Sequence, residues 1–157
     1  MTLREAGFQI LQAAIKAGDV GPLVTGALGS MDLSRYRRVL VVGAGKASGA
    51  MARTLEGVLG DRISVGLVVV KDGYTAPTRK IRLVEAGHPI PDERGLRAAN
   101  EILAVARSAG ADDLVIVLIS GGGSALAPCP APPITLEEKQ ALTRLLLAAG
   151  ATINELN

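Results

Sequence analysis

Two glycine-rich segments carry the residue types that hold anions in proteins. Gly43–Ser48 has the sequence Gly-Ala-Gly-Lys-Ala-Ser, and Ser120–Ser124 places three adjacent glycines between two serines. Glycine reaches φ > 0 at little cost and lets N–H groups approach a ligand, and N–H groups at a helix start attract anions. We therefore predict that both turns hold an anionic substrate. The candidate binding residues are Gly43, Gly45, Lys46, Ser48, Ser120, Gly121, Gly122, Gly123 and Ser124.

Lys46 favours a ligand at the first turn over a simple connection. A lysine at the first turn of a helix opposes the helix dipole, unless an anion lies between its ammonium group and the N–H groups. Lys46 is therefore the candidate catalytic residue. The structural alternatives are a tight turn that closes a strand against a helix at Gly43–Ser48, and a flexible loop at Ser120–Ser124.

Few other residues suggest chemistry. His88 is the single histidine and stands between Gly87 and Pro89. It is either a general base or substrate-binding group, or a histidine packed in a rigid loop. Cys129 lies among prolines with no base near it in sequence, and no cluster of His, Cys and carboxylates has the spacing of metal ligands. We therefore predict no metal-binding residue.

The standard nucleotide motifs do not fit the first turn. A Walker A motif would need glycine where Leu40 stands and Ser or Thr where Ala47 stands. The dinucleotide pattern Gly-x-Gly-x-x-Gly/Ala would need Gly or Ala where Ser48 stands. Lys71 precedes Asp72 after the next strand, and a lysine there could contact the 2′-phosphate of NADP. The NADP interpretation therefore stays open.

Buried strands alternate with helices along the chain. Helical spacing of apolar residues predicts helices over 3–17, behind Gly43–Ser48, behind Asp92 and behind the capping box at Thr135, whereas residues 22–34 are ambiguous. This alternation predicts a three-layer α/β/α domain with a mostly parallel, Rossmann-like sheet, in which both glycine turns follow buried strands at the ligand-binding edge. The expected strands are Arg38–Val42, Ser64–Val70, Ile81–Glu85 and Leu114–Ile119.

Composition narrows the function further. The 157 residues suit one domain, and with 48% hydrophobic but only 2% aromatic residues the core must be aliphatic. A net charge of +2 without a basic stripe argues against nucleic-acid binding. The chain has no apolar run of the ~20 residues that a membrane span needs. One cysteine allows no internal disulfide, so we expect a cytoplasmic protein.

Three segments in order give the chain a family resemblance. Val41–Ser48, Ala86–Asp92 and Leu118–Leu126 resemble signature segments of the bacterial and archaeal glycerate 2-kinases of the MOFRL type, which are often mislabelled hydroxypyruvate reductases. Thr135–Asn157 also resembles the family, so the likeness covers nearly the whole chain.

The resemblance implies ATP-dependent phosphorylation of D-glycerate to 2-phosphoglycerate with Mg²⁺. It assigns a catalytic role to Lys46, and it implies that Ser120–Ser124 holds a phosphate or the glycerate carboxylate. Family members are much longer and add a second domain that carries a catalytic arginine. The resemblance therefore makes residues 1–157 an incomplete N-terminal Rossmann-like domain of a two-domain kinase, inactive alone, with a homodimer left open. The loop Pro128–Pro133 is richer in proline than the family pattern.

Two other functions remain as alternatives. The first is an NADP-dependent hydroxypyruvate or glyoxylate reductase, which depends on the Gly43-x-Gly45 pattern and on Lys71. The second is a non-catalytic anion-binding module of the sugar-isomerase-like type.

Overall fold

The computed structural model describes residues 1–29 and 31–156. Ser30 lies outside this described part, as does Asn157, the last residue of the segment that resembles the kinases. Within the described part, no helix combines the length and the apolar character that crossing a bilayer requires.

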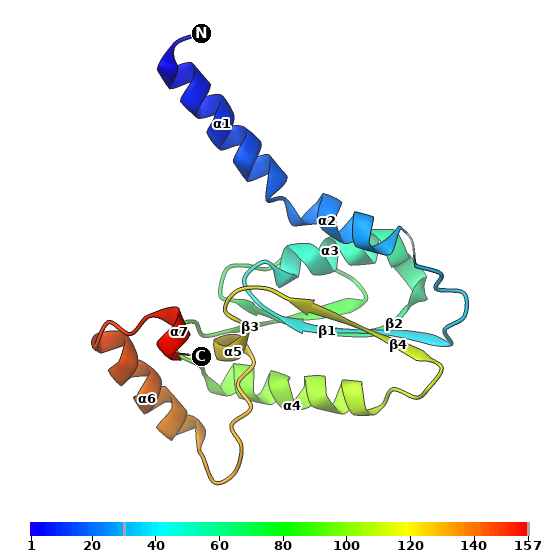
Figure 1. Cartoon of the computed structure of the whole chain (residues 1–157). Coiled ribbons are helices and arrows are strands. Elements are labelled where there is room, and N and C mark those ends of the chain that lie inside the picture. The colour runs from blue at the N-terminus through cyan, green and yellow to red at the C-terminus, as the bar shows by residue number, and fades with distance from the viewer. Residues whose placement is uncertain (30, 157) are drawn as a thin grey trace.

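A four-stranded parallel sheet forms the centre of the molecule (Figure 1). The strand order is β3-β2-β1-β4, and every neighbouring pair runs parallel. The predicted parallel sheet is confirmed, and each strand extends beyond its predicted bounds by one to two residues. The strands are β1 (Arg38–Ala44), β2 (Ile63–Lys71), β3 (Ile81–Ala86) and β4 (Asp113–Ile119).

Helices cover both faces of the sheet, which gives the predicted three layers. Helix α3 lies on one face with α2 packed against it, and α4 lies on the other face with the short α5 (Figure 1). The helices are α1 (Leu3–Ala17), α2 (Val20–Leu28), α3 (Ser48–Leu59), α4 (Glu93–Arg107), α5 (Gly123–Leu126), α6 (Leu136–Ala148) and α7 (Ile153–Leu156), and a 3₁₀ turn spans Gly60–Arg62. The ambiguous stretch 22–34 thus contains the greater part of α2.

Local signals set several helix ends as the sequence predicts. The carboxylate of Asp92 accepts a hydrogen bond from the Gly95 N–H at 2.9 Å and begins α4. The capping box of Thr135 and Glu138 begins α6. After α6, Gly150 adopts φ 74°, a left-handed conformation that terminates the helix.

The core is aliphatic and divided by the sheet. On the α3 face, Val39, Val41 and Val68 are completely buried with Leu55 of α3. On the α4 face the core is smaller and is built around Val69. This confirms the expectation from composition, because a chain with so few aromatic rings must fill its interior with branched aliphatic side chains.

Strand β4 is exposed on one face, which corrects the expectation that Leu114–Ile119 is a buried strand. Leu118 is 4% exposed, but Val117 and Ile119 are 55% and 69% exposed. The physical reason is position: β4 is an edge strand, and α4 lies over β1, β2 and β3 instead. The apolar run predicts a strand correctly, yet it does not show which helix covers it.

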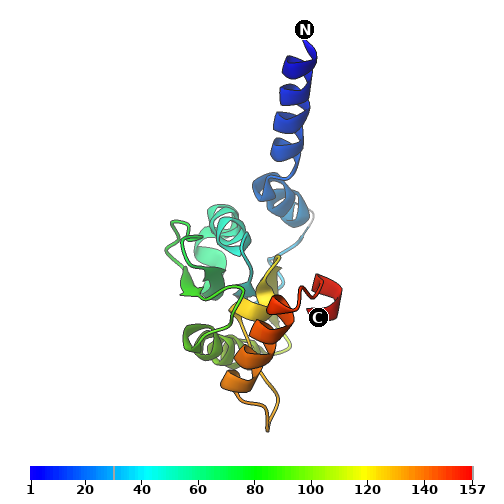
Figure 2. The same ribbon diagram turned by 90° about the vertical axis from the view of Figure 1, so that its left-hand side faces the viewer.

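Helix α1 projects away from the rest of the molecule in both views (Figures 1 and 2). None of its residues is buried, and Phe8, Ile10 and Ile15 are each more than half exposed. The predicted amphipathic helix over 3–17 is confirmed. Its apolar side contacts no other described element closely enough to be covered.

Leu55 provides a test of the α3 face of the core. We expect Leu55→Ala to lower the free energy of unfolding by about 2–5 kcal/mol, because a buried leucine loses its contacts and leaves a cavity. Val58→Ala on the same helix is the control, since Val58 is 48% exposed and its truncation should change stability by less than about 1 kcal/mol. Urea unfolding followed by circular dichroism measures both, and equal losses would contradict this packing.

Candidate functional site

The two glycine turns lie side by side at the carboxyl edge of the sheet. Ala44 pairs with Ile119 at the ends of β1 and β4, so the segments that follow leave the sheet together. The Ser120 N–H then donates to the Ala44 carbonyl at 3.2 Å. Gly45 has φ 148°, and a Cβ there would collide with the Ser120 hydroxyl and carbonyl. This close approach, in a conformation that favours glycine, explains why the first turn requires glycine at position 45.

Hydrogen bonds join the two turns directly. The Ala47 N–H donates to Oγ of Ser120 at 2.9 Å, and the Lys46 N–H donates to the Gly121 carbonyl at 3.0 Å. The buried Ser48 hydroxyl lies 3.1 Å from Oγ of Ser120 and 3.2 Å from the Leu118 carbonyl. Ser120 therefore caps the start of α3 from another part of the chain, where a helix otherwise leaves free donors.

The first turn does not form the open anion cradle that the sequence suggests. Besides the N–H groups of Lys46 and Ala47, that of Gly45 donates to the Val69 carbonyl at 3.0 Å, and that of Ser48 to the Gly45 carbonyl at 3.2 Å. The donors at 45–48 thus have protein acceptors. The physical reason is the neighbouring turn, whose oxygens occupy the place where an anion would bind.

The second turn keeps its donors free. Among residues 1–29 and 31–156, no hydrogen bond uses the N–H groups of Gly121, Gly122, Gly123 or Ser124. Gly122 is left-handed, with φ 94° and ψ 2°, and Gly123 begins α5. A left-handed residue followed by a right-handed one turns successive N–H groups toward a common point, which is the geometry of an anion-binding nest. We call residues 121–124 the nest.

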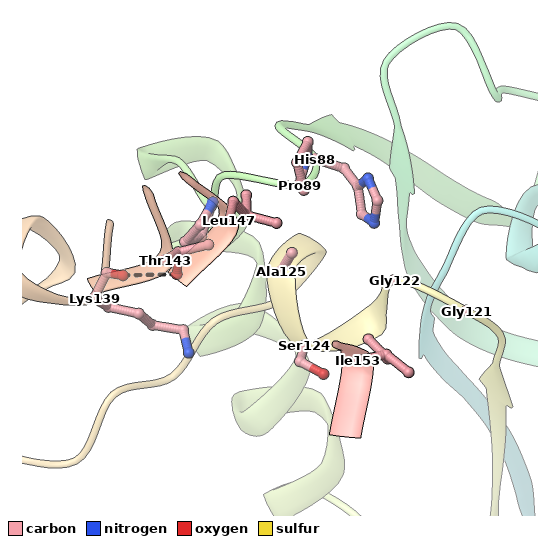
Figure 3. Close-up of a pocket in the computed structure, with 11 residues that line it drawn as sticks. His88, Pro89, Gly121, Gly122, Ser124, Ala125, Lys139, Thr143, Leu147 and Ile153 are labelled. Carbon is pink, nitrogen blue, oxygen red and sulfur yellow. Dashed lines mark hydrogen bonds between the residues drawn. The ribbon is translucent and has the colours of Figure 1, made fainter. Parts of the chain in front are cut away.

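Lys46 and His88 approach the nest from two sides. A Cβ built on Gly122 would lie 2.8 Å from Nε2 of His88 and 3.7 Å from Cε of Lys46. Figure 3 shows the His88 imidazole directed toward the turn at Gly121 and Gly122. The structure therefore brings together the lysine, the histidine and the second glycine turn that the sequence singles out.

The pKa of His88 lies below the ordinary value for histidine. Partial burial disfavours the charged imidazolium, and the positive charges of Lys46 and Lys71 add to this effect. This shift favours the neutral imidazole over the imidazolium. A neutral imidazole near an anion site can accept a proton or a hydrogen bond from a substrate hydroxyl.

Helices α6 and α7 contribute residues that sequence patterns do not reveal. A cavity of about 280 Å³ beside the nest is lined by His88 and by Lys139, Thr143 and Ile153 from these helices (Figure 3). Gln140 holds α6 here through a 2.8 Å hydrogen bond from its Nε2 to the Pro91 carbonyl. The capping box locates the start of α6 in the sequence, but its place beside the nest depends on long-range contacts such as this one.

Comparison with known protein families identifies the family of this chain. The family profile described as "Domain of unknown function (DUF4147)" matches residues 7–157. The chain belongs to the DUF4147 family.

Named relatives of this DUF4147 domain include kinases and reductases. A glycerate 2-kinase of Pyrococcus horikoshii is 39% identical over 100% of this chain and 37% of its own length. A protein of Agrobacterium vitis that carries the name of a hydroxypyruvate reductase is 50% identical over 76% of this chain and 31% of its own.

The crystal structure of glycerate kinase from Thermotoga maritima matches with a TM-score of 0.84 and 36% identity. The match covers 98% of this chain and 37% of that one, and it confirms the α/β fold. The DUF4147 domain described here thus spans about a third of the length of these relatives.

Gly122 and Gly121 provide a matched pair of substitutions in the nest. We expect Gly122→Ala to lower the free energy of unfolding by about 1–2 kcal/mol, because an L-residue is strained at φ 94°, and to displace the His88 imidazole. The methyl group of Gly121→Ala would meet only Cε of Lys46, at an ordinary 3.8 Å, so His88 should stay in place. Urea unfolding and the NMR signals of the imidazole report the two effects, and identical spectra for both variants would contradict the contact.

The charge beside His88 can be measured by NMR titration. We expect the imidazole to titrate below the ordinary histidine pKa of ~6.5, and Lys46→Met to raise that pKa, because one nearby positive charge is removed. Lys16→Met in α1 removes an equal charge far from the site and serves as the control. An unchanged His88 pKa in Lys46→Met would show that the lysine does not face the imidazole.

Proposed function

We propose that this chain is the N-terminal, substrate-binding part of an ATP-dependent kinase that phosphorylates D-glycerate on its 2-hydroxyl group. The observation that carries the proposal is the nest, whose four N–H groups have no acceptor among the described residues and lie beside Lys46 and His88. The glycerate kinases of Pyrococcus and Thermotoga, which align with nearly the whole chain, support it.

Each residue of the site has a part in this chemistry. Phosphoryl transfer depends chiefly on positioning and on stabilising negative charge. The nest N–H groups would hold phosphate oxygens of ATP, and the Lys46 ammonium group would stabilise the charge on the transferred phosphoryl group. His88 would accept the proton of the acceptor hydroxyl as that oxygen bonds to the γ-phosphorus of ATP and the bond between this phosphorus and the ADP leaving group breaks.

Most of the remaining candidate site residues would act by positioning Lys46. Gly43, Gly45, Ser48 and Ser120 lie in the joint between the turns, where their close contacts hold Lys46 beside the nest. We propose that they are positioning residues rather than direct ligands. Ser124 lines the cavity next to His88 and can contact a bound phosphate.

Mg²⁺, which the resemblance implies, has no ligand set in the cavity at His88. Among the described residues, no group of three or more His, Cys, Asp or Glu side chains could hold a metal ion. The cavity at His88 is lined by Lys139 and contains no carboxylate. Mg²⁺ prefers carboxylates and phosphate oxygens, so we assign it to none of these residues.

The length of the relatives supports a two-domain arrangement. Because the chain spans about a third of their length, we propose that residues 1–157 supply one wall of the cleft and that a second domain supplies the other. The family resemblance places a catalytic arginine in that second domain. The 157-residue chain would then bind anions but transfer phosphate slowly or not at all by itself.

The reductase alternative is weaker on geometric grounds. A dinucleotide-binding turn uses the N–H groups after its first strand to hold the pyrophosphate. Here those of Lys46 and Ala47 already donate to Gly121 and Ser120. A reductase would need this joint to open before NADP could bind.

Activity of the natural gene product that contains this chain tests the proposal. We expect ADP formation with D-glycerate in a coupled assay, and we expect Lys46→Met to lower kcat by roughly 10²–10³-fold, because a charge that stabilises the transition state is lost. Lys16→Met is the control and should retain full activity. Failure with every hydroxy acid would contradict the kinase, and oxidation of NADPH by hydroxypyruvate would favour the reductase.

A further inference from the structure

A second cavity lies beside Lys46, separate from the one that His88 lines. It measures about 300 Å³ and separates the start of α3 from the loop 73–77. Lys46, Ala50 and Arg53 form one side of it. Ala50 and Arg53 are three residues apart on one face of α3, and Lys46 lies just before that helix begins. Tyr74 and Thr75 belong to the loop that forms the opposite side.

The loop that forms the far side of this cavity is held in place at both ends. The Glu56 carboxylate accepts hydrogen bonds from the N–H groups of Arg79, Lys80 and Ile81 at 2.6, 2.8 and 3.0 Å. At the other end, the Gly73 N–H donates to Glu85 at 2.6 Å. The cavity is therefore preformed, and a ligand would not have to order the loop.

The cavity carries positive charge without a compensating acid. Its lining contains Lys46 and Arg53 but no Asp or Glu. The ion pairs formed by described residues include neither of these two cations. Acids that contact the loop or adjoin it have other partners. Asp72 forms a two-point pair with Arg94 at 2.7 and 2.9 Å. Glu56 and Glu85 accept hydrogen bonds from backbone N–H groups at the two ends of the loop.

We propose that this cavity binds the carboxylate of the acceptor substrate, with Arg53 as its principal ligand. A guanidinium group offers two parallel N–H donors that match the two oxygens of a carboxylate. The nest instead offers several N–H groups that converge on one point, which suits a phosphate. The identification of the acceptor as glycerate depends on the proposed kinase function, whereas carboxylate binding at Arg53 does not.

This assignment places Lys46 between two anions. Its ammonium group would face the phosphates at the nest on one side and the acceptor carboxylate on the other. Two negatively charged substrates repel each other, and a shared cation reduces that repulsion where they must meet. The assignment also separates the roles of the turns, because only the second would contact the nucleotide.

Arg53→Ala in the natural gene product tests the assignment by its effect on two Michaelis constants. We expect KM for D-glycerate to rise roughly 10- to 100-fold, because hydrogen bonds to a charged carboxylate are lost, while KM for ATP changes less than about twofold. Arg53→Lys keeps the charge without the paired donors and should give an intermediate KM. Arg107→Ala, at an exposed position in the last turn of α4, is the control. A rise in KM for ATP alone would indicate that the cavity binds nucleotide phosphates. If neither Michaelis constant changed, the cavity would not be part of the active site.

A binding measurement on the 157-residue chain separates this inference from the kinase proposal. NMR spectra recorded with D-glycerate should show shifts at the amides of Tyr74 and Thr75 that Arg53→Ala abolishes, and inorganic phosphate should instead shift Gly121–Ser124. Shifts at the loop without any kinase activity would retain the carboxylate site and contradict the kinase. Kinase activity with no Arg53-dependent shift or change in KM would retain the kinase and contradict the carboxylate site.

Discussion

The hydrogen bond from the Ala47 N–H to Oγ of Ser120 is the interaction on which the site depends. It joins the segments that follow β1 and β4, and it satisfies a donor at the start of α3 that would otherwise need water or a ligand. The buried Ser48 hydroxyl strengthens the joint, and the absence of a side chain at Gly45 permits the close approach. Because Lys46 lies within this joint, the same contacts hold its backbone beside the second turn.

The joint also gives different hydrogen-bonding states to two turns of similar composition. A backbone N–H group that donates to a protein oxygen is no longer available to a ligand, so the acceptors at Ser120 and Gly121 convert the first turn into a structural connection. The second turn supplies those acceptors, while the N–H groups of residues 121–124 have no acceptor in the described part of the chain. The left-handed conformation of Gly122 then gathers these donors beside Lys46 and His88.

Sequence patterns predict the parts of this structure that depend on neighbouring residues. Apolar runs locate the four strands, and capping residues such as Asp92 and Thr135 locate helix starts, because these signals act over a few residues. Patterns cannot show that Val117 is uncovered or that Arg53 faces a loop some twenty residues away, because both depend on which elements pack together. Patterns also cannot show which of the two turns has its N–H groups occupied by protein acceptors. That depends on the hydrogen bond between Ala47 and Ser120, which are 73 residues apart.

The edge position of β4 has a consequence for what can be built onto this sheet. An edge strand leaves a row of backbone donors and acceptors open, and here the exposed side chains of Val117 and Ile119 extend that surface. A strand added parallel to β4 would end at the same rim of the sheet as Ile119, one residue before the second turn. The loop after such a strand would emerge beside Ser120–Ser124, so a strand added at this edge would bring new backbone next to the nest.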